Sequence, residues 1–378
     1  MKCATTILAF CVAALLALGT VMLCSSPSGA KLLNQQLMWS VLGIAACVTA
    51  AAVDYRKLKS ISIPLLLVTA ILLAAVFVPH VGVKAGGARR WLNLHFMNFQ
   101  PSEMAKLALI IVIAHYVDHF QRQMPTLKRG LFLPAAFIGP VLGLIFLEPD
   151  YGTTILLATV SAMMLVVGGV RMTVIGPTVL VGIVALSAAV MTNDIRRARV
   201  MAFIYPEQHQ QTKGFQQYQA TIALGSGGLT GVGLGDGRQK HGYVPANHTD
   251  FILSIVGEEL GLVATMGVVI AFMAIAICGV FIASRAPDRF GMLLACGITF
   301  LIALQAFINI GVVTSALPNK GLALPFVSYG GSSIVAMLAC VGVLFSVARR
   351  AKEPERARVR GRKGNPFNPG EIPSTQLP

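Results

Sequence analysis

Charged side chains are scarce in this sequence of 378 residues. They make up 12% of the chain, whereas hydrophobic residues make up 55%, and the mean hydropathy is +0.73. An ordinary soluble domain has about 25% charged residues, which it needs to cover its surface. The shortage of charge excludes a chain of two or three soluble domains and indicates one helical domain within a membrane.

The sequence also lacks the cysteine pairs of a disulfide framework or a zinc site. It contains seven cysteines but no CxxC pair, and none of the seven falls in the long polar stretch at 193–250. All of them lie in or beside apolar segments: Cys3, Cys11, Cys24, Cys47, Cys278, Cys296 and Cys340. We expect them to behave as small hydrophobic side chains.

Long apolar runs, in contrast, are abundant. A run of about 18 apolar residues is long enough to cross a bilayer as a helix. Such runs begin near Ala4, Leu37, Ile61, Met104, Leu131, Tyr151, Val174, Phe251, Phe290 and Ser333. We therefore expect an all-α integral membrane protein with about ten transmembrane helices and a long extracytoplasmic loop between spans seven and eight. The first run is longer than a signal-peptide core, so we expect it to be retained as a helix.

Membrane topology explains the formal net charge of +15 better than a nucleic-acid ligand does, because lysine and arginine accumulate in cytoplasmic loops. With the N-terminus inside, the inner segments contain Arg56, Lys57, Lys59, Arg122, Lys128, Arg129, Arg171, Arg285, Arg289, Arg349 and Arg350. Both termini are thus predicted to be cytoplasmic. The membrane domain is predicted to cover residues 1–350, and the basic segment 351–378 to be a disordered cytoplasmic tail near anionic lipid.

Two predicted outer segments contain cations against this rule. The segment after span three carries Lys84, Arg89 and Arg90. The outer loop at about 193–250 carries Arg196, Arg197, Arg199, Lys213, Arg238 and Lys240. These cations bind either lipid headgroups or an anionic substrate at the outer leaflet, and the polar groups in the same segments favour the substrate.

Ionisable groups at membrane depth are costly, so each is a candidate functional group. Glu103 and Lys106 are three residues apart and can pair on one helix face. The other candidates are Glu148, Asp150, His248, Asp250, Glu258 and Glu259. Each carboxylate has a structural alternative as an ion-pair partner or a helix cap, and Asp250 suits a helix N-terminus. Gln305 and Asn309 either line the same site or join helices by hydrogen bonds.

Two other features have competing interpretations. The glycine-rich run at 225–235 follows no strand and precedes no GK[ST], which disfavours a nucleotide-binding phosphate loop. The glycines are expected to allow tight backbone turns. Contact with a lipid pyrophosphate is the alternative. Trp91 is one of two tryptophans. It is either an interfacial anchor or, beside Arg89 and Arg90, part of a site for a sugar phosphate.

Several motifs together resemble the SEDS family (shape, elongation, division and sporulation). They are GARRWL at 87–92, FQPSE at 99–103, EPDYGT at 148–153, HTDFI at 248–252, GEELG at 257–261, LPNKG at 317–321 and PFVSYGGSS at 325–333. Their order and spacing match across the chain except for the tail. Within the family, GEELG and the NKGL of 319–322 are closer to the division branch, FtsW, than to RodA.

The resemblance implies a peptidoglycan glycosyltransferase that polymerises lipid II at the outer face of the bacterial cytoplasmic membrane, for septal wall synthesis in cell division. It also implies a class B penicillin-binding protein, a transpeptidase, as partner, together with other divisome or elongation-complex proteins. The family's catalytic aspartate corresponds to Asp250 and its outer-loop tryptophan to Trp91. We expect substrate contacts at Trp91, Arg89, Arg90, Glu103, Lys106, His248, Glu258, Lys213 and Lys240.

We expect no organic cofactor, while a divalent cation, Mg²⁺ or Mn²⁺, would suit a diphosphate leaving group. Two other functions are compatible with the same residues. A lipid II flippase would require substrate contacts at both membrane faces. A non-catalytic scaffold that activates the transpeptidase would leave Asp250 replaceable. The concentration of unusual residues on the outer side favours the enzyme.

Overall fold

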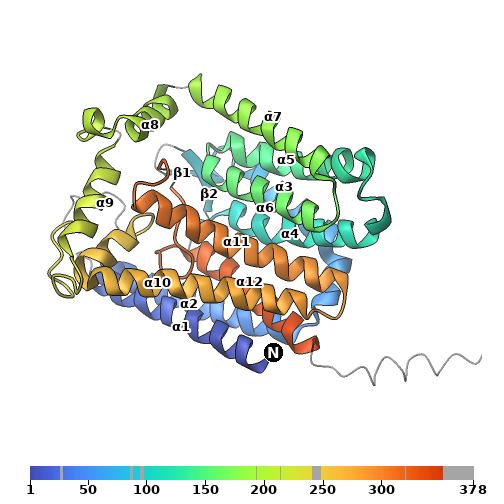
Figure 1. Cartoon of the computed structure of the whole chain (residues 1–378), viewed down its shortest axis with the longest axis horizontal. Coiled ribbons are helices and arrows are strands. Elements are labelled where there is room, and N and C mark those ends of the chain that lie inside the picture. The colour runs from blue at the N-terminus through green and yellow to red at the C-terminus, as the bar shows by residue number, and fades with distance from the viewer. Residues whose placement is uncertain are drawn as a thin grey trace, which may run out of the picture.

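The protein is a bundle of long helices in a computed structural model, which describes residues 1–25, 29–85, 88–93, 98–192, 194–212, 214–240, 248–319 and 321–351. The long helices run roughly along one direction (Figure 1). They are α1 (Lys2–Ser25), α2 (Gly29–Ala52), α3 (Leu58–Ala75), α4 (Pro101–His119), α5 (Leu133–Leu147), α6 (Tyr151–Val167), α7 (Met172–Met191), α10 (Ile252–Ser284), α11 (Arg289–Val313) and α12 (Gly331–Arg350). Each predicted span starts in one of these helices or directly before it, so the all-α membrane fold is confirmed.

Eight helices within the described ranges are long and apolar enough to cross a membrane. The two other predicted spans are α4 and α6. Helix α4 has 19 residues but carries Glu103, Lys106 and Asp118, and α6 is apolar but has 17 residues. The number of ten spans therefore stays a prediction.

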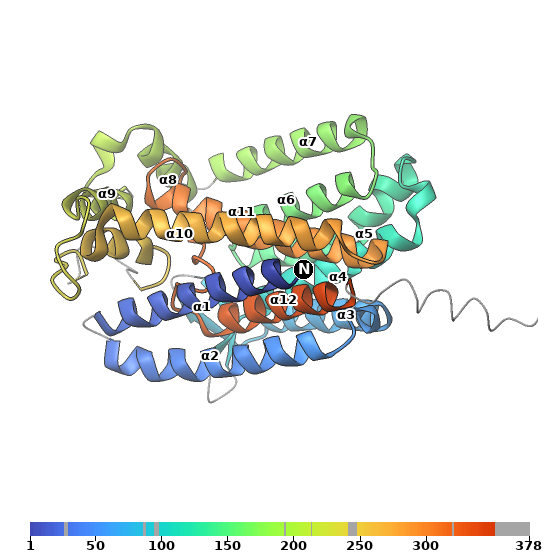
Figure 2. The same cartoon turned by 60° about the horizontal axis from the view of Figure 1, so that its bottom comes forward.

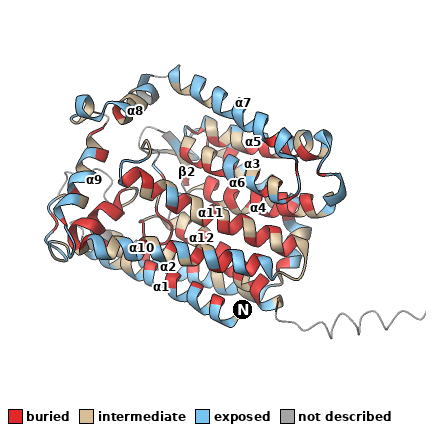
Figure 3. Ribbon diagram, in the orientation of Figure 1, coloured by how far each residue is buried: buried red, intermediate tan, exposed pale blue. Residues whose placement is uncertain are grey.

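Burial divides the bundle into an inner and an outer set of helices. In α11 and α12, 61% and 67% of the apolar span is buried, against 6% in α7. Figure 3 shows α7 as an almost wholly exposed helix at the edge, while the buried residues concentrate in α4 and α11. Exposed leucine, isoleucine and valine side chains on the outer helices are what a hydrocarbon surrounding requires.

One end of the bundle carries most of the irregular structure. The segment after α3 forms an antiparallel sheet of β1 (Gly82–Ala85), β2 (Ala88–Asn93) and β3 (Asn98–Phe99). The predicted outer loop contains α8 (Asp194–Ile204), the turn Pro206–His209 and α9 (Phe215–Ser226). The sheet, α8 and α9 lie toward the same end of the bundle (Figure 1). We call this the cavity end, because residues of the sheet line the cavity described below.

The opposite end holds both the start of α1 and the end of α12 (Figure 2). Cations predicted to be cytoplasmic form ion pairs here between segments distant in sequence. The pairs are Arg56–Asp288 at 3.0 Å, Lys59–Asp118 at 2.6 Å and Arg350–Asp54 at 2.9 Å. The separation of basic loops from the cavity end is the pattern on which the predicted orientation depends.

Helix α10 is broken near its N-terminus. Gly261 has φ 75° and ψ −171°, so residues 252–260 form a short helix separate from the rest of α10. The glycine segment, residues 227–235, lies across the break and bonds the backbone groups that the break frees. The bonds are Val232 N–H to Glu258 O, Gly233 N–H to Glu259 O, Leu262 N–H to Gly228 O and Val263 N–H to Leu229 O, at 2.9–3.3 Å. The glycine-rich run is thus a backbone clamp on α10, which supports the tight-turn interpretation.

Replacing Gly231 with alanine should destabilise this clamp. Gly231 has φ 83°, and a Cβ there would lie 2.1 Å from the carbonyl oxygen of Glu259. Forcing such overpacking costs about 1–3 kcal/mol. Gly235 is a matched control, because it also has positive φ, 94°, but no atom within 4 Å of the added Cβ. In thermal unfolding of the detergent-solubilised protein, Gly231→Ala should lower the midpoint clearly more than Gly235→Ala. Equal effects would contradict the close packing.

Candidate active site

A cavity of about 670 Å³ lies at the cavity end of the bundle. Its walls come from α2, the sheet, α4, the start of α6, the residues just before α10, α11, and the segment 321–333. Six of the predicted site residues line it: Arg90, Trp91, Glu103, Lys106, His248 and Asp250. These residues are separated by up to 160 positions in the sequence, so the fold brings them together.

A buried ion pair forms the part of the wall that α4 contributes. Lys106 Nζ donates to Glu103 Oε1 at 2.7 Å and to Gln305 Oε1 at 3.1 Å. The side chains of Lys106 and Glu103 are 2% and 8% exposed. The predicted pairing of these two residues on one helix face is therefore confirmed. Because the pair is internally neutral, Lys106 adds little net positive charge to the cavity.

Asp250 precedes the short helix of α10 without capping it. The N-cap position is Phe251, and no side chain makes a cap hydrogen bond there. The structural alternative for Asp250, a helix cap, is thus wrong. Asp250 lines the cavity.

The backbone of the aspartate segment, residues 248–250, is held at three consecutive carbonyl groups. Each carbonyl accepts a hydrogen bond from a different donor. The bonds are Tyr329 N–H to His248 O at 2.9 Å, Ser328 Oγ to Thr249 O at 2.6 Å, and Asn309 Nδ2 to Asp250 O at 2.8 Å. Of the two functions left open for Asn309, the structure shows the hydrogen-bonding one. Together the bonds fix the position of the aspartate relative to α11 and α12.

The surroundings of Asp250 favour a basic carboxylate. Burial raises the pKa of Asp250 to about 6, the negative charge of Asp150 adds to this, and the cations Arg90 and Arg199 oppose it. Burial lowers the pKa of the neighbouring His248, so the imidazole is neutral at pH 7. An aspartate that remains ionised at pH 7 but binds a proton more readily than usual is suited to general base catalysis.

Arg90 is fixed by the turn between α5 and α6. Its Nε donates to the carbonyl oxygen of Glu148 at 3.2 Å, and its Nη2 donates to that of Pro149. Among the described residues Arg90 has no carboxylate within ion-pair distance, so its charge is available to the cavity. Arg89 is exposed on β2 and does not line the cavity.

The two acids of this turn have different functions. Asp150 caps α6, accepting hydrogen bonds from the N–H of Thr153 at 3.2 Å and from its Oγ1 at 3.0 Å. Glu148 is 1% exposed, and burial, reinforced by Asp150 and opposed by Arg90, raises its pKa to about 8. Glu148 is therefore neutral at pH 7, while Asp150 also lines the cavity.

Both tryptophans of the chain line the cavity. Trp91 was predicted from its motif, whereas Trp39 on α2 was not. The indole of Trp39 packs so closely on α12 that a Cβ at Gly331 would lie 2.1 Å from its Cε2. The pattern of α2 alone carries no sign of this contact, because it depends on the packing of α2 against α12.

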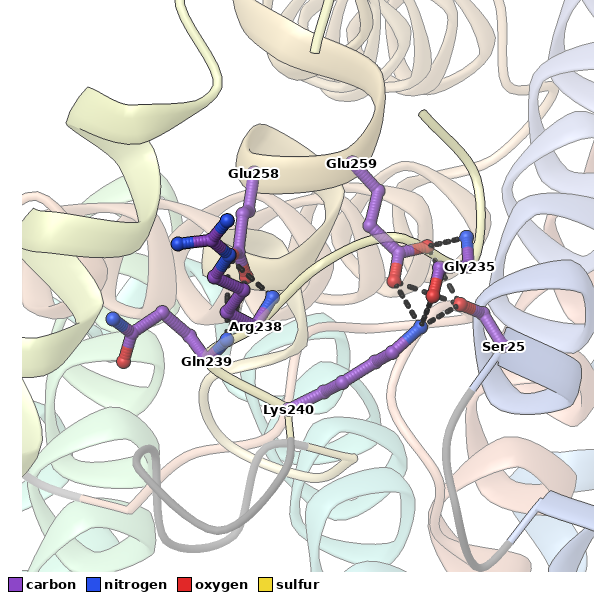
Figure 4. Close-up of polar contacts among 7 residues, drawn as sticks. All are labelled: Ser25, Gly235, Arg238, Gln239, Lys240, Glu258 and Glu259. Carbon is purple, nitrogen blue, oxygen red and sulfur yellow. Dashed lines mark hydrogen bonds and ion pairs between the residues drawn. The ribbon is translucent and has the colours of Figure 1, made fainter. Parts of the chain in front are cut away.

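Glu258 and Lys240 lie outside the cavity, in a second cluster that joins the outer loop to α10 and α1 (Figure 4). Lys240 Nζ contacts Glu259 Oε1 at 2.7 Å, Ser25 Oγ at 2.9 Å and the Gly235 carbonyl at 2.6 Å. Glu258 accepts from the backbone N–H groups of Arg238 and Gln239 at 2.7 and 3.2 Å. These contacts favour the structural alternative for Glu258, and they give Lys240 partners within the protein instead of the lipid headgroup or substrate that was predicted. Lys213 lies outside the described residues.

No group of three potential metal ligands among His, Cys, Asp and Glu occurs in the described part of the chain. Asp150 and Asp250 line the same cavity. Magnesium commonly binds to one or two carboxylates together with substrate phosphates, so a carboxylate of this cavity suits a cation that arrives with a diphosphate.

Comparison with known proteins identifies the family. The family model for FtsW, RodA and SpoVE, described as "Cell cycle protein", matches residues 5–353. The chain belongs to this family. The "Probable peptidoglycan glycosyltransferase FtsW" of Geobacter metallireducens is 39% identical over 353 residues, covering 90% of this chain and 93% of the relative. The protein of the same name from Pseudomonas fluorescens is 36% identical over 346 residues, covering 88% and 85%.

Solved structures of the family have the same fold. One chain, from "Structural coordination of polymerization and crosslinking by a peptidoglycan synthase complex", has a TM-score of 0.76 and 29% identity and covers 92% of this chain and 98% of its own. The rod shape determining protein RodA of Thermus thermophilus has a TM-score of 0.70 and 29% identity, covering 92% and 97%. The resemblance found in the sequence motifs is confirmed.

The second cluster should contribute stability rather than substrate affinity. Glu259→Gln leaves the ammonium group of Lys240 buried without its carboxylate, which typically costs about 3–5 kcal/mol. The double variant Lys240→Met/Glu259→Leu should recover part of this loss, because no unpaired charge remains. Arg56→Gln is the control, since it removes a partly exposed pair that is worth about 1 kcal/mol or less.

The measurement is the midpoint of thermal unfolding for these three variants and for Lys240→Met alone. If Lys240→Met weakened substrate binding while leaving the unfolding midpoint unchanged, Lys240 would be a substrate contact and the structural interpretation would be wrong.

Proposed function

We propose that this protein is a peptidoglycan glycosyltransferase that polymerises lipid II at the outer face of the cytoplasmic membrane. The observation that carries the proposal is Asp250, an aspartate with a raised pKa, in a segment whose three carbonyl groups each accept a hydrogen bond, at a cavity that Arg90 and two tryptophans also line. The names of the curated relatives state the same activity for those proteins.

In the proposed reaction, Asp250 is the general base. It accepts the proton of the 4-hydroxyl of the acceptor sugar as that oxygen attacks the anomeric carbon of the donor chain. The new bond joins the oxygen to this carbon, and the bond from this carbon to the diphosphate oxygen breaks. A single displacement inverts the configuration, from an α-linked donor to a β-linked glycan. A well-placed base contributes about 10²–10⁴-fold to such a rate.

The leaving group is a polyprenyl diphosphate, and negative charge grows on it during the displacement. Arg90 is the cation best placed to stabilise that charge, because carbonyl oxygens rather than a carboxylate hold it beside the cavity. Fixed charges of this kind stabilise the transition state without reorganising. Lys106 is neutralised by Glu103 and therefore shapes the cavity rather than binding the diphosphate.

The site suits a divalent cation that is bound together with the diphosphate. Asp150, which also lines the cavity, would provide a protein ligand for it, and the cation would stabilise the leaving oxygen. The base function of Asp250 and the charge of Arg90 do not depend on that cation.

The cavity end is proposed to face the periplasm or cell exterior. Basic loops gather at the opposite end with the start of α1 and the end of α12, and cations of short loops mark the cytoplasmic side. The polyprenyl chain would remain in the bilayer while the sugars enter the cavity at the interface. A class B penicillin-binding protein is the proposed partner, because the similar solved chain comes from a peptidoglycan synthase complex, and the FtsW relatives favour division over elongation.

Asp250→Asn should abolish polymerisation of labelled lipid II by the purified protein with its cognate transpeptidase. The amide cannot accept the proton, so the rate should fall by about 10²-fold or more. Equal assembly of both complexes, checked by gel filtration, is the control. Glycan strands from the mutant as long as those from wild type would show that a residue other than Asp250 is the general base. No strands from either protein would remove the enzyme proposal and leave lipid II transport as the activity to measure.

The rate of polymerisation should increase as the pH rises through about 6, where Asp250 loses its proton, and level off above that pH. Asp150→Asn removes a charge that raises this pKa, so the acid limb of kcat/KM should move to lower pH. Arg199→Gln removes a charge that lowers it, so the limb should move to higher pH. An acid limb that moves in neither variant would contradict the assignment of Asp250 as the base.

A further inference from the structure

One part of the cavity lining, next to the proposed base, consists of uncharged side chains. It begins at His248, two residues before Asp250, and continues through Tyr329 to α2, where Gln35 and Trp39 line the cavity. The rings of His248 and Tyr329 pack edge to face, with their centroids 5.9 Å apart. The Tyr329 hydroxyl donates to Gln35 Oε1 at 2.6 Å. We call these four residues, Gln35, Trp39, His248 and Tyr329, the uncharged wall.

The charged side chains of the lining come from other elements. Arg90 lies on β2, Glu103 and Lys106 lie on α4, and Asp150 directly precedes α6. Asp250 is close to both parts of the lining, because the charge of Arg90 lowers its pKa and the uncharged wall begins two residues before it. The base therefore lies where a charged and an uncharged part of the cavity meet.

The α2 part of the uncharged wall is accessible to a ligand. Gln35 and Trp39 are four residues apart, so they lie on one face of α2. Gln35 is exposed and Trp39 is partly exposed. The indole of Trp39 packs on Gly331, where an added Cβ would lie 2.1 Å from Cε2, and Trp39 also lines the cavity. Trp39 is thus held in place by α12 while part of its surface faces the cavity.

Aromatic rings beside an exposed amide suit a sugar better than an anion. The C–H groups of a hexose pack on an aromatic face, and an amide exchanges hydrogen bonds with hydroxyl and acetamido groups. A diphosphate requires cations, and those of the lining belong to its charged part. In the proposed reaction, the sugar that must lie beside Asp250 is the acceptor, whose 4-hydroxyl loses its proton.

We propose that Trp39 and Gln35 of the uncharged wall bind the terminal N-acetylhexosamine of the glycosyl acceptor. The inference rests on the proposed function, which makes Asp250 the base for that sugar. The ring of the sugar packs on Trp39, and Gln35, whose amide is oriented by Tyr329, bonds one of its polar groups. The donor and its diphosphate then occupy the charged part of the cavity. Trp39 and Gln35 are thus specificity-determining residues for the acceptor.

The test measures binding of chitotetraose to the full-length protein in phosphatidylcholine nanodiscs by saturation-transfer NMR. This β-1,4-linked chain of N-acetylglucosamine has a free 4-hydroxyl and no phosphate. Trp39→Leu should raise the Kd about tenfold, because the aromatic face is lost. Trp39→Phe keeps an aromatic face and should raise the Kd less. Gln35→Ala should raise it about fivefold, the effect of one hydrogen bond.

Asn34→Ala is the matched control. Asn34 is an exposed amide beside Gln35 that does not line the cavity, so its loss should leave the Kd unchanged. Because Trp39 packs on α12, the unfolding midpoint of each variant is measured as well, and Gln35→Ala tests the wall at an exposed position where no packing is lost.

Three results would overturn the proposal. They are no saturable binding of chitotetraose to the wild type, a Kd for chitotetraose that neither Trp39→Leu nor Gln35→Ala changes, and equal affinity for maltotetraose, which has no acetamido group.

Geranylgeranyl diphosphate distinguishes the acceptor from the donor. Its Kd, measured in the same nanodiscs by isothermal titration calorimetry, should be the same in wild type, Trp39→Leu and Gln35→Ala. A rise in that Kd with no change in chitotetraose binding would assign the wall to the donor's diphosphate and overturn the proposal.

Binding and turnover separate this inference from the proposed function. Chitotetraose binding that depends on Trp39 and Gln35, without any polymerisation of lipid II, would support the sugar site and contradict the enzyme. Polymerisation that depends on Asp250, with chitotetraose binding indifferent to both variants, would support the enzyme and contradict the sugar site.

Discussion

The break in α10 is the constraint on which the arrangement of the site depends. A continuous helix from residue 252 onward would leave no free backbone groups at Gly261, but a broken one frees four that cannot be left unpaired near the membrane. The glycine segment satisfies them, and the buried pair of Lys240 and Glu259 ties the outer loop to the same place. The short helix that follows Asp250 thereby gains a position of its own, independent of the long membrane-spanning part of α10.

Charge at the cavity is balanced so that one cation and one base remain available. Glu103 and Lys106 neutralise each other at 2.7 Å, and burial keeps Glu148 in its neutral form. What remains is Arg90, held by carbonyl oxygens, opposite Asp150 and Asp250. These remaining charges suit a reaction in which a carboxylate accepts a proton and a cation stabilises the anion that leaves.

The sequence alone was sufficient for the helices and for the charged residues that line the cavity, since the length of an apolar run and the cost of a buried charge are local properties. It failed where the answer depends on backbone conformation or packing. Hydropathy does not register the positive φ of Gly261, so it did not predict the break in α10, and it did not distinguish Asp250 from Glu258 as candidate functional residues. Asp250 lies before the helix, and Glu258 bonds the outer loop instead.

The sheet was missed for a related reason: its strands are four, six and two residues long, too short for alternation to be seen. Trp39 was missed because only the packing of α2 on α12 brings it to the cavity. Both omissions concern the walls of the site rather than its charged groups. Charged groups are recognisable in isolation because their presence in an apolar chain is already unusual, whereas a wall residue is defined only by its neighbours.

The ion pairs at the end of the bundle opposite the cavity bear on whether the cavity transfers or transports its substrate. A transport path for the substrate would first have to pass the buried Glu103–Lys106–Gln305 cluster at the cavity. It would then have to leave between the helices that the ion pairs Arg56–Asp288 and Lys59–Asp118 join. Passage of a charged headgroup would require these bonds to break in sequence, with the buried pair alone costing several kcal/mol to separate. The aspartate segment, in contrast, is held rigidly by three hydrogen bonds from α11 and the 328–329 turn. Rigidity at a reacting group favours catalysis, and the buried Glu103–Lys106 pair at the cavity opposes transport, so the two sets of contacts both favour the enzyme.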